Sequence, residues 1–160
     1  MKISKKIENT SVLVIGIGSI GLQHVQKLTH IGMQVSILEK DKSKLKKLHN
    51  IKQFQIYFQL SEAKKKVYDL IVIASTGPSH YDLFISLLSN TKNFLIEKPL
   101  ANSIKRVNQI FEIAKKKNLN VLIHHQRSIF ELPKIKNIFQ KHKETPQQVI
   151  CSGGNTCLVT

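Results

Sequence analysis

The sequence predicts an α/β protein built on a doubly wound parallel sheet. Short apolar runs alternate with amphipathic stretches from residue 11 to about 125, and several runs are apolar at every position. Strands of that composition are buried on both faces, as in parallel sheets covered by helices on each side. The expected strands are residues 11–16, 34–39, 53–58, 69–75, 93–97 and 120–124. Right-handed crossovers between them place ligands at the carboxyl ends of the strands.

The stretches between the strands have the apolar spacing of amphipathic helices, and Ser103 is a suitable N-cap for the last of them. The residues expected at helical spacing are Val25 and Leu28, then Phe84, Leu87 and Leu88, then Val107, Ile110, Phe111 and Ala114. These apolar faces are expected to cover the sheet.

The pattern changes after residue 125, where a helix is expected over 131–142 and a strand over 147–152. This strand has no obvious partner after a completed sheet. We therefore expect residues 1–127 to form one domain. Residues 128–160 are expected to hold a connecting helix and only the first strand of a second, α+β domain.

A glycine-rich turn follows the first expected strand, in the run Gly16-Ile17-Gly18-Ser19-Ile20-Gly21. In a β-turn-α unit, Gly16 allows the tight turn, Gly18 lets the backbone approach a pyrophosphate, and Gly21 lets the helix lie close to the strand. The helix that begins here directs unpaired N–H groups and a positive dipole end toward the phosphates. The turn therefore predicts a dinucleotide site.

An acid at the end of the second expected strand supports this interpretation. Glu39 lies 18 residues beyond Gly21, where its carboxylate accepts hydrogen bonds from the hydroxyls of the adenosine ribose. A glycine-rich turn that binds nothing would not account for that acid. NAD is the expected cofactor because a carboxylate repels a 2′-phosphate; the adjacent Lys40 softens this preference and leaves NADP open.

Composition indicates a soluble globular protein, with 41% hydrophobic and 22% charged residues in a chain of 160. No apolar run reaches the roughly 18–20 residues that span a bilayer, and the N-terminus lacks the apolar stretch of a secretion signal. The two cysteines, Cys151 and Cys157, have no metal-ligand spacing. We expect a cytoplasmic protein without a membrane partner.

The net charge of +15 raises the alternative of a nucleic-acid binder. Almost all of this charge is lysine, and Arg106 and Arg127 are the only arginines. Nucleic-acid sites favour arginine and interleave aromatic side chains. We expect solvated helix faces instead, with no nucleic-acid partner; attraction of anionic substrates is the remaining explanation.

Three further clusters follow expected strands: Ser75-Thr76-Gly77-Pro78-Ser79-His80, Glu97-Lys98-Pro99 and His124-His125-Gln126-Arg127. In the first, Pro78 suits an initial helical turn, and His80 lies either near the cofactor or on the surface. The second places a carboxylate and an ammonium at the ligand rim, beside a proline whose peptide bond can be cis. The third includes a candidate interior histidine, and Arg127 suits recognition of an anion or hydroxyl. Further metal ligands are missing, so no metal is expected.

The glycine turn and the three clusters, in this order, resemble the N-terminal half of the Gfo/Idh/MocA family, which includes glucose–fructose oxidoreductase and inositol dehydrogenase. The resemblance extends over essentially the whole chain, and Glu97-Lys98-Pro99 is its most specific element. It implies an NAD(P)-binding Rossmann domain followed by a larger antiparallel sheet domain. In the family that second domain builds most of the sugar pocket and usually the oligomer interface.

The resemblance also implies residue roles. Lys98 would be catalytic, contacting the nicotinamide ribose and the reacting hydroxyl, while Glu97 positions it and Pro99 shapes the loop. His80 and Arg127 would line the nicotinamide and substrate region. The complete set of expected cofactor-binding residues is Gly16, Gly18, Ser19, Ile20, Gly21, Glu39, Lys40, Ser75, Thr76, Pro78, His80, Glu97, Lys98 and Arg127.

Two departures from the family pattern stand out. Ser128 follows Arg127 where members often carry an aromatic or basic residue, and the sequence has no Asp-x-x-x-His motif, whose histidine is the family's proton-transfer residue. We expect a truncated product, a fragment or half of a split protein. The predicted function is NAD(P)-dependent oxidation or reduction at a hydroxyl of a sugar, amino sugar or cyclitol. The alternatives are a non-catalytic dinucleotide-binding module, or a remnant of a truncated gene.

Overall fold

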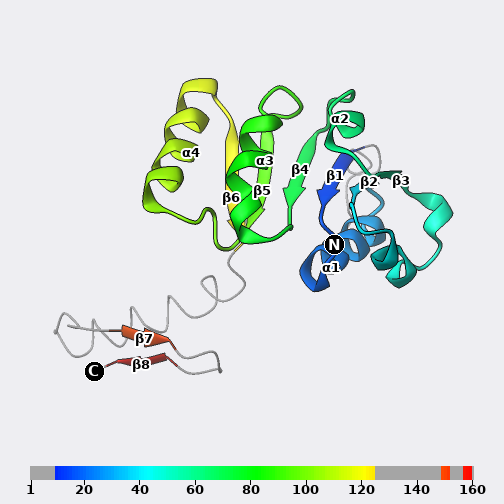
Figure 1. Ribbon diagram of the computed structural model, residues 1–160, viewed down its shortest axis with the longest axis horizontal. Coiled ribbons are helices and arrows are strands. Elements are labelled where there is room, and N and C mark those ends of the chain that lie inside the picture. The colour runs from blue at the N-terminus through cyan, green and yellow to red at the C-terminus, as the bar shows by residue number, and fades with distance from the viewer. Residues whose placement is uncertain (1–9, 125–148, 152–156, 160) are drawn as a thin grey trace. The chain divides into compact units, whose positions relative to one another are not determined.

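The computed structural model describes residues 10–124, 149–151 and 157–159. The chain divides into two compact units, residues 1–124 and 125–160 (Figure 1). The first unit contains a six-stranded sheet, and the second contains a two-stranded sheet. The expected domain boundary after residue 127 and the expected helix over 131–142 lie outside the described residues.

The six strands of the first unit are all parallel and lie in the order β3-β2-β1-β4-β5-β6. They are β1 (Ser11–Ile15), β2 (Gln34–Leu38), β3 (Gln55–Tyr57), β4 (Leu70–Ile73), β5 (Asn93–Glu97) and β6 (Asn120–His124). The strand order reverses between β1 and β4, which is the position where doubly wound sheets bind ligands. The predicted doubly wound parallel sheet is confirmed.

Helices connect the strands (Figure 1). The α-helices are α1 (Ser19–His30), α2 (Leu60–Ala63), α3 (His80–Ser86) and α4 (Ile104–Lys117), and the 3₁₀ helices are η1 (Lys42–Lys47), η2 (Ile51–Gln53) and η3 (Gly77–Ser79). Ser103 caps α4 as expected, because its hydroxyl accepts a hydrogen bond from the Arg106 N–H at 3.3 Å. None of the described helices has the length and apolar character needed to cross a membrane.

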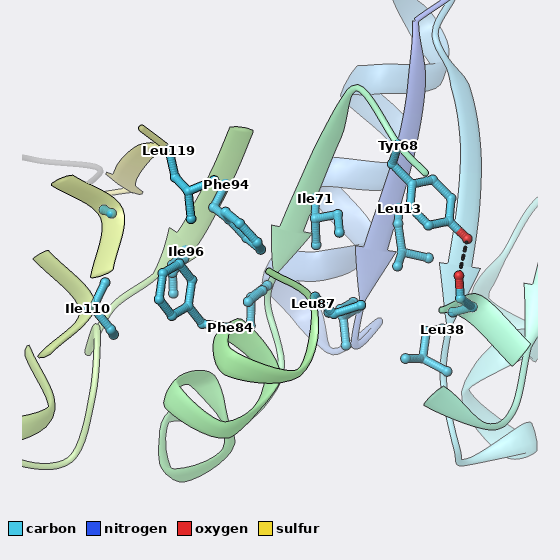
Figure 2. Packing of buried hydrophobic residues seen from close by; sticks show 14 of the residues in the cluster. Leu13, Leu38, Tyr68, Ile71, Phe84, Leu87, Phe94, Ile96, Ile110 and Leu119 are labelled. Carbon is cyan, nitrogen blue, oxygen red and sulfur yellow. Dashed lines mark hydrogen bonds between the residues drawn. The ribbon is translucent and has the colours of Figure 1, made fainter. Parts of the chain in front are cut away.

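Two apolar layers cover the opposite faces of the sheet, because successive strand residues point to opposite sides. One layer joins α3 and α4 to the sheet through Phe84, Phe94 and Ile110, as Figure 2 shows. The rings of Phe84 and Phe94 meet edge to face at 4.9 Å. The other layer packs Val25 of α1 against Val12 and its neighbours. The core therefore supports the strand ends from both sides.

Phe111 was expected on the inner face of α4, and this expectation was wrong. Phe111 remains 47% exposed, whereas its neighbour Ile110 is fully buried. Successive helical residues are rotated by about 100°, so Ile110 and Ala114 face the sheet while Phe111 points toward solvent. Leu122 of the edge strand β6 is also exposed, at 67%.

The strand expected near the C-terminus does have a partner, so the expectation of an unpaired strand was wrong. In the second unit, β7 (Val149–Cys151) pairs antiparallel with β8 (Cys157–Val159). The three-residue β8 was too short for its apolar pattern to be recognised in the sequence.

The contrast between Phe84 and Phe111 gives a direct test of this packing. We expect Phe84→Ala to lower the free energy of unfolding by about 3–5 kcal/mol, because a fully buried ring leaves a cavity. Phe111→Ala, at a half-exposed position, is the matched control and should cost much less. Urea denaturation followed by circular dichroism measures both; equal losses would contradict the assigned core.

Candidate functional site: the cavity at the strand-order reversal

A cavity of about 510 Å³ lies at the carboxyl ends of the strands where their order reverses. It is bordered by the turn after β1, the end of β2 and the loop after β4. Its lining includes Gly16, Gly18, Ser19, Ile20, Glu39, Lys40, Lys44, Ser75, Thr76 and Ser79. Most of the residues predicted to bind the dinucleotide therefore meet around one cavity.

Gly16 and Gly21 have the close-packing geometry that the sequence predicts, and the role of Gly18 at the pyrophosphate stays a prediction. Gly16 has φ +84°, and a Cβ there would lie 2.8 Å from Ser75 Cα. A Cβ on Gly21 would lie 1.9 Å from the carbonyl oxygen of Gly16. Gly18 differs because a Cβ there would meet nothing within 4 Å. The first and third glycines thus permit close packing, while the second leaves open space for a ligand.

Glu39 is almost completely buried, with 6% exposure. Its carboxylate joins the turn after β1 to the turn after β2. Oε2 accepts a hydrogen bond from the Ile17 N–H and Oε1 accepts one from the Asp41 N–H, both at 3.0 Å. Burial favours the neutral acid, but these two N–H groups and nearby Lys44 outweigh that effect and lower the pKa of Glu39. The group is therefore a carboxylate at neutral pH.

The loop after β4 forms a second border of the cavity. Ser75 and Ser79 share a hydrogen bond between hydroxyls at 2.8 Å, and the Ser79 hydroxyl also reaches the Thr76 carbonyl oxygen at 2.8 Å. Pro78 lies in η3, the first turn before α3, as the sequence predicts. These contacts fix the hydroxyls of the loop beside the glycine turn.

His80 is not on the surface, which corrects one of its two expected positions; it lies beside the cavity, because its ring contacts the carbonyl oxygen of the cavity-lining Ser75. It is fully buried, with Nε2 2.9 Å from the Ser75 carbonyl oxygen and Nδ1 2.8 Å from the Pro99 carbonyl oxygen. Burial follows from its place at the start of α3, which packs directly on the sheet. His80 therefore joins the loop after β4 to the loop after β5.

Glu97, at the end of β5, is held by two histidines. Its Oε1 lies 2.6 Å from His24 Nε2 of α1 and 2.6 Å from His124 Nδ1 of β6. The two rings meet edge to face at 5.1 Å. Burial raises the pKa of Glu97, but the hydrogen bonds from both histidines outweigh it, so the pKa lies below its ordinary value. The carboxylate is thus anchored from two elements.

Lys98 follows this anchored carboxylate and is exposed, and the Lys98–Pro99 peptide bond is cis, as the sequence allowed. Its neighbour Pro99 is tied through its carbonyl oxygen to His80. The lysine therefore projects from a backbone that is held on both sides. Arg127, the remaining predicted site residue, lies outside the described part of the chain.

His24, Glu97 and His124 are the three described residues whose ligand atoms converge closely enough to hold a metal ion. Glu97 Oε1 lies 2.6 Å from each nitrogen, a hydrogen-bond separation. Ligands of tetrahedral zinc, bound at about 2.0–2.1 Å, lie farther apart than this. The observed geometry is thus that of a carboxylate accepting hydrogen bonds from two N–H groups. The absence of a bound metal stays a prediction.

Comparison with known proteins agrees with a dinucleotide site at this cavity. The sequence profile of the Gfo/Idh/MocA oxidoreductase family, with an NAD-binding Rossmann fold, matches residues 10–125. The chain belongs to this family. It is an NAD-binding Rossmann domain, and its described cavity provides the glycine turn and the carboxylate that such a domain needs.

Individual relatives match only part of their own length. Trans-1,2-dihydrobenzene-1,2-diol dehydrogenase of Xenopus tropicalis is 36% identical over 89 residues, which are 53% of this chain and 26% of the relative. The chain thus spans about a quarter of the curated relatives that it matches.

Solved structures share the fold. Myo-inositol 2-dehydrogenase from Lactobacillus plantarum has a TM-score of 0.70 and 19% identity, covering 89% of this chain and 43% of that one. GenD2 from gentamicin A biosynthesis, solved with NAD, has a TM-score of 0.72 and 19% identity over 91% and 43% of the two chains.

Three residues around the site were not identified from the sequence. His24 lies one helical turn after Gly21, and this spacing was the available sequence signal that it lies near the site. Lys44 is one of the lysines that were expected on solvated helix faces, yet it lies 3.4 Å from Glu39 and lines the cavity. Ser79 belongs to a predicted cluster, but its hydroxyl contacts depend on the tight η3 turn.

Gly18 and Gly21 separate cofactor binding from folding. We expect Gly18→Ala to leave the free energy of unfolding within about 1 kcal/mol, since its Cβ meets nothing, but to weaken NAD binding because the methyl obstructs backbone approach. Gly21→Ala should cost about 3 kcal/mol or more through its clash with the Gly16 backbone. Calorimetry and urea denaturation distinguish the two; NAD affinity unchanged in Gly18→Ala would refute its role.

The lowered pKa of Glu97 makes the fold sensitive to acid. A carboxyl group whose pKa is lower in the folded state stabilises that state at pH values above its unfolded pKa of about 4.3. This contribution to stability is lost as the pH falls through the folded pKa. The unfolding free energy should therefore fall more steeply below about pH 4.5 in the wild type than in Glu97→Gln. The other carboxyls with lowered pKa values, Glu39, Asp41 and Asp69, titrate in both proteins, so the difference between the two profiles reports the Glu97 contacts. Parallel pH profiles would contradict the anchoring contacts.

Proposed function

We propose that this chain is the nucleotide-binding part of a dehydrogenase that acts on a hydroxyl of a sugar, amino sugar or cyclitol. The observation that carries the proposal is the placement of Lys98, an exposed ammonium on a backbone whose neighbouring Glu97 and Pro99 are both held by histidines. Rigid support of this kind is what a residue needs to position a reacting group.

The described residues fit NAD. Open space at Gly18 admits the pyrophosphate, the first turn of α1 has N–H groups without helical partners, and Glu39 presents a carboxylate to the adenosine ribose. When bound, NAD supplies the hydride acceptor. Thr76 and Ser75 border the same cavity from the β4 side.

Lys98 then has two tasks in this proposal. Its ammonium donates a hydrogen bond to a hydroxyl of the nicotinamide ribose, and it orients the substrate hydroxyl whose proton is removed as the carbon is oxidised. Glu97 does not transfer that proton, because its carboxylate is occupied by His24 and His124. It fixes the backbone from which Lys98 extends.

The names of relatives support the substrate class. The curated relatives are named for a ring-borne diol, and one structural neighbour is named for inositol. We extend to this chain the shared chemistry, a secondary hydroxyl on a ring bearing further hydroxyls. A dinucleotide-binding module without turnover is the second candidate, favoured by the described lining of the cavity, which does not include Lys98.

The role of Lys98 can be measured through binding. We expect Lys98→Ala to weaken NAD about tenfold, the size of one hydrogen bond from a charged donor. Lys105→Ala, an exposed lysine on α4, is the control and should leave the affinity unchanged. Calorimetric titration measures both. Equal affinity in wild type and Lys98→Ala would refute the contact.

Turnover tests whether this chain alone suffices for catalysis. Sugars, amino sugars and inositols are mixed with the purified chain and NAD or NADP, and absorbance of the reduced cofactor is followed. We expect activity near background for the chain alone, because general acid–base help is typically worth about 10²–10⁴-fold and the family's motif for it is missing. Robust turnover that is lost in Lys98→Ala would show that this chain suffices.

A further inference from the structure

The two cysteines of the chain occupy paired positions in the second unit. Cys151 and Cys157 are the only cysteines of the sequence. In the antiparallel sheet of β7 and β8, the register sets Cys151 directly opposite Cys157, next to the pair of Ile150 and Leu158. The described lining of the nucleotide cavity includes neither cysteine, so the proposed dehydrogenase chemistry does not use them. The fold thus brings the two cysteine backbones together for a separate reason.

This register suits a disulfide bond. Directly opposed residues of an antiparallel pair have Cα atoms about 4.5 or 5.5 Å apart, depending on whether the two residues exchange hydrogen bonds. A disulfide needs Cα atoms about 4.4–6.8 Å apart, so either kind of pair meets the requirement. A register shift of one residue would place the two positions on opposite faces of the sheet. The strand register, and not only nearness in the sequence, therefore makes the pair suitable.

The small sheet that carries the cysteines gains most from a cross-link. β7 and β8 have three residues each, and they form a sheet of two strands. A two-stranded sheet by itself is at best marginally stable in water. A covalent bond between its strands restricts the conformations of the unpaired chain and thereby favours the paired form. The oxidation state of the two sulfur atoms therefore determines how firmly these strands pair.

From this register we propose that Cys151 and Cys157 are a reversible redox modification site whose oxidant is a low-molecular-weight disulfide such as oxidised glutathione. One cysteine thiolate attacks that disulfide, which forms a mixed disulfide and releases one glutathione. The second cysteine thiolate attacks the protein sulfur of the mixed disulfide, which forms the Cys151–Cys157 bond and releases the second glutathione. The protein loses two electrons and two protons, and one oxidised glutathione becomes two thiols. Excess reduced thiol reverses both steps.

Closure can be measured on the full chain in glutathione buffers. The chain is equilibrated without oxygen at fixed ratios of reduced and oxidised glutathione, the remaining thiols are blocked with N-ethylmaleimide, and the peptides are weighed by mass spectrometry. Trypsin leaves residues 144–160 as one peptide, because Lys143 is the last lysine or arginine of the sequence. The closed peptide lacks two hydrogens, the open peptide carries two maleimide adducts, and the mixed disulfide carries glutathione. We expect the closed peptide to dominate at about 1 mM of each glutathione form, because a short connection alone gives an effective concentration of that order.

Two register variants separate strand pairing from nearness in the sequence. Cys157→Ser/Leu158→Cys moves one thiol by a single position out of register with Cys151, and should lower the equilibrium constant for closure at least about tenfold. Adding Ile150→Cys/Cys151→Ser to this variant restores a directly opposed pair. Closure should then return to within about threefold of the wild type, although the separation in sequence is longer, because loop length has only a weak effect.

Hydrogen exchange gives a second readout on the same samples. The amides of the two strands should exchange at least about tenfold more slowly in the closed form than in the reduced form, because the cross-link opposes their local opening. Amides of β1 in the first unit are the internal control and should be unchanged. In Cys151→Ser, which cannot close, oxidised glutathione should leave the exchange of both strands unaltered.

Equal closure constants in the wild type and in the out-of-register variant would overturn the role of the register. A wild type that keeps both thiols open in the glutathione buffer would overturn the site itself. The site would also be refuted if the wild type formed only disulfides that join two copies of the 144–160 peptide. No nucleotide is present in these measurements, so their outcome is independent of the proposed NAD site.

Discussion

The site depends on the close approach of two backbones where the strand order reverses. The turn after β1 passes so near the end of β4 that a Cβ at Gly16 would meet Ser75, and α1 begins so near that turn that a Cβ at Gly21 would meet Gly16. Only glycine allows both contacts. This packing brings the first turn of α1, the Ser75 loop and Glu39 around one cavity.

A second set of contacts organises the other part of the site. His80 links the loops after β4 and β5 through two carbonyl oxygens, and His24 and His124 hold Glu97 from α1 and β6. All three histidines serve backbone or carboxylate positions flanking Lys98. Backbone glycines therefore shape the dinucleotide cavity, while side-chain hydrogen bonds support the lysine. The lowered pKa of Glu97 adds a dependence on pH to the second region.

The fold and the glycine roles were predictable because each rests on a local pattern. Continuous apolar runs mark strands buried on both faces, and the spacing of Gly16, Gly18 and Gly21 is a consequence of one β-turn-α geometry. Ser103 as a helix cap was likewise local. The expectations that failed depended on the rotation of a side chain about its helix axis or on strand pairing. Phe111 is turned away from the sheet, and β8 pairs with β7, a strand that was expected to be unpaired.

The missed site residues required tertiary information. His24 is 73 positions from Glu97 in sequence, and only the crossing of α1 over the strand ends brings them together. Lys44 belongs to a lysine-rich segment, and nothing in its composition distinguishes the one lysine that faces Glu39. His80 was placed in the correct region, but burial at the start of α3 gives it a linking role instead of a ligand contact.

The central claim is that the turn after β1 binds the pyrophosphate of NAD through its backbone. Amide ¹H–¹⁵N spectra of the labelled chain, recorded during an NAD titration, test it most directly. The largest shifts are predicted at Gly18, Ser19 and Ile20, with smaller changes at Glu39 and Ser75 and none at Asn93, which begins β5 at the amino ends of the strands. Saturable NAD binding that leaves the amides of the glycine turn unshifted would contradict the account.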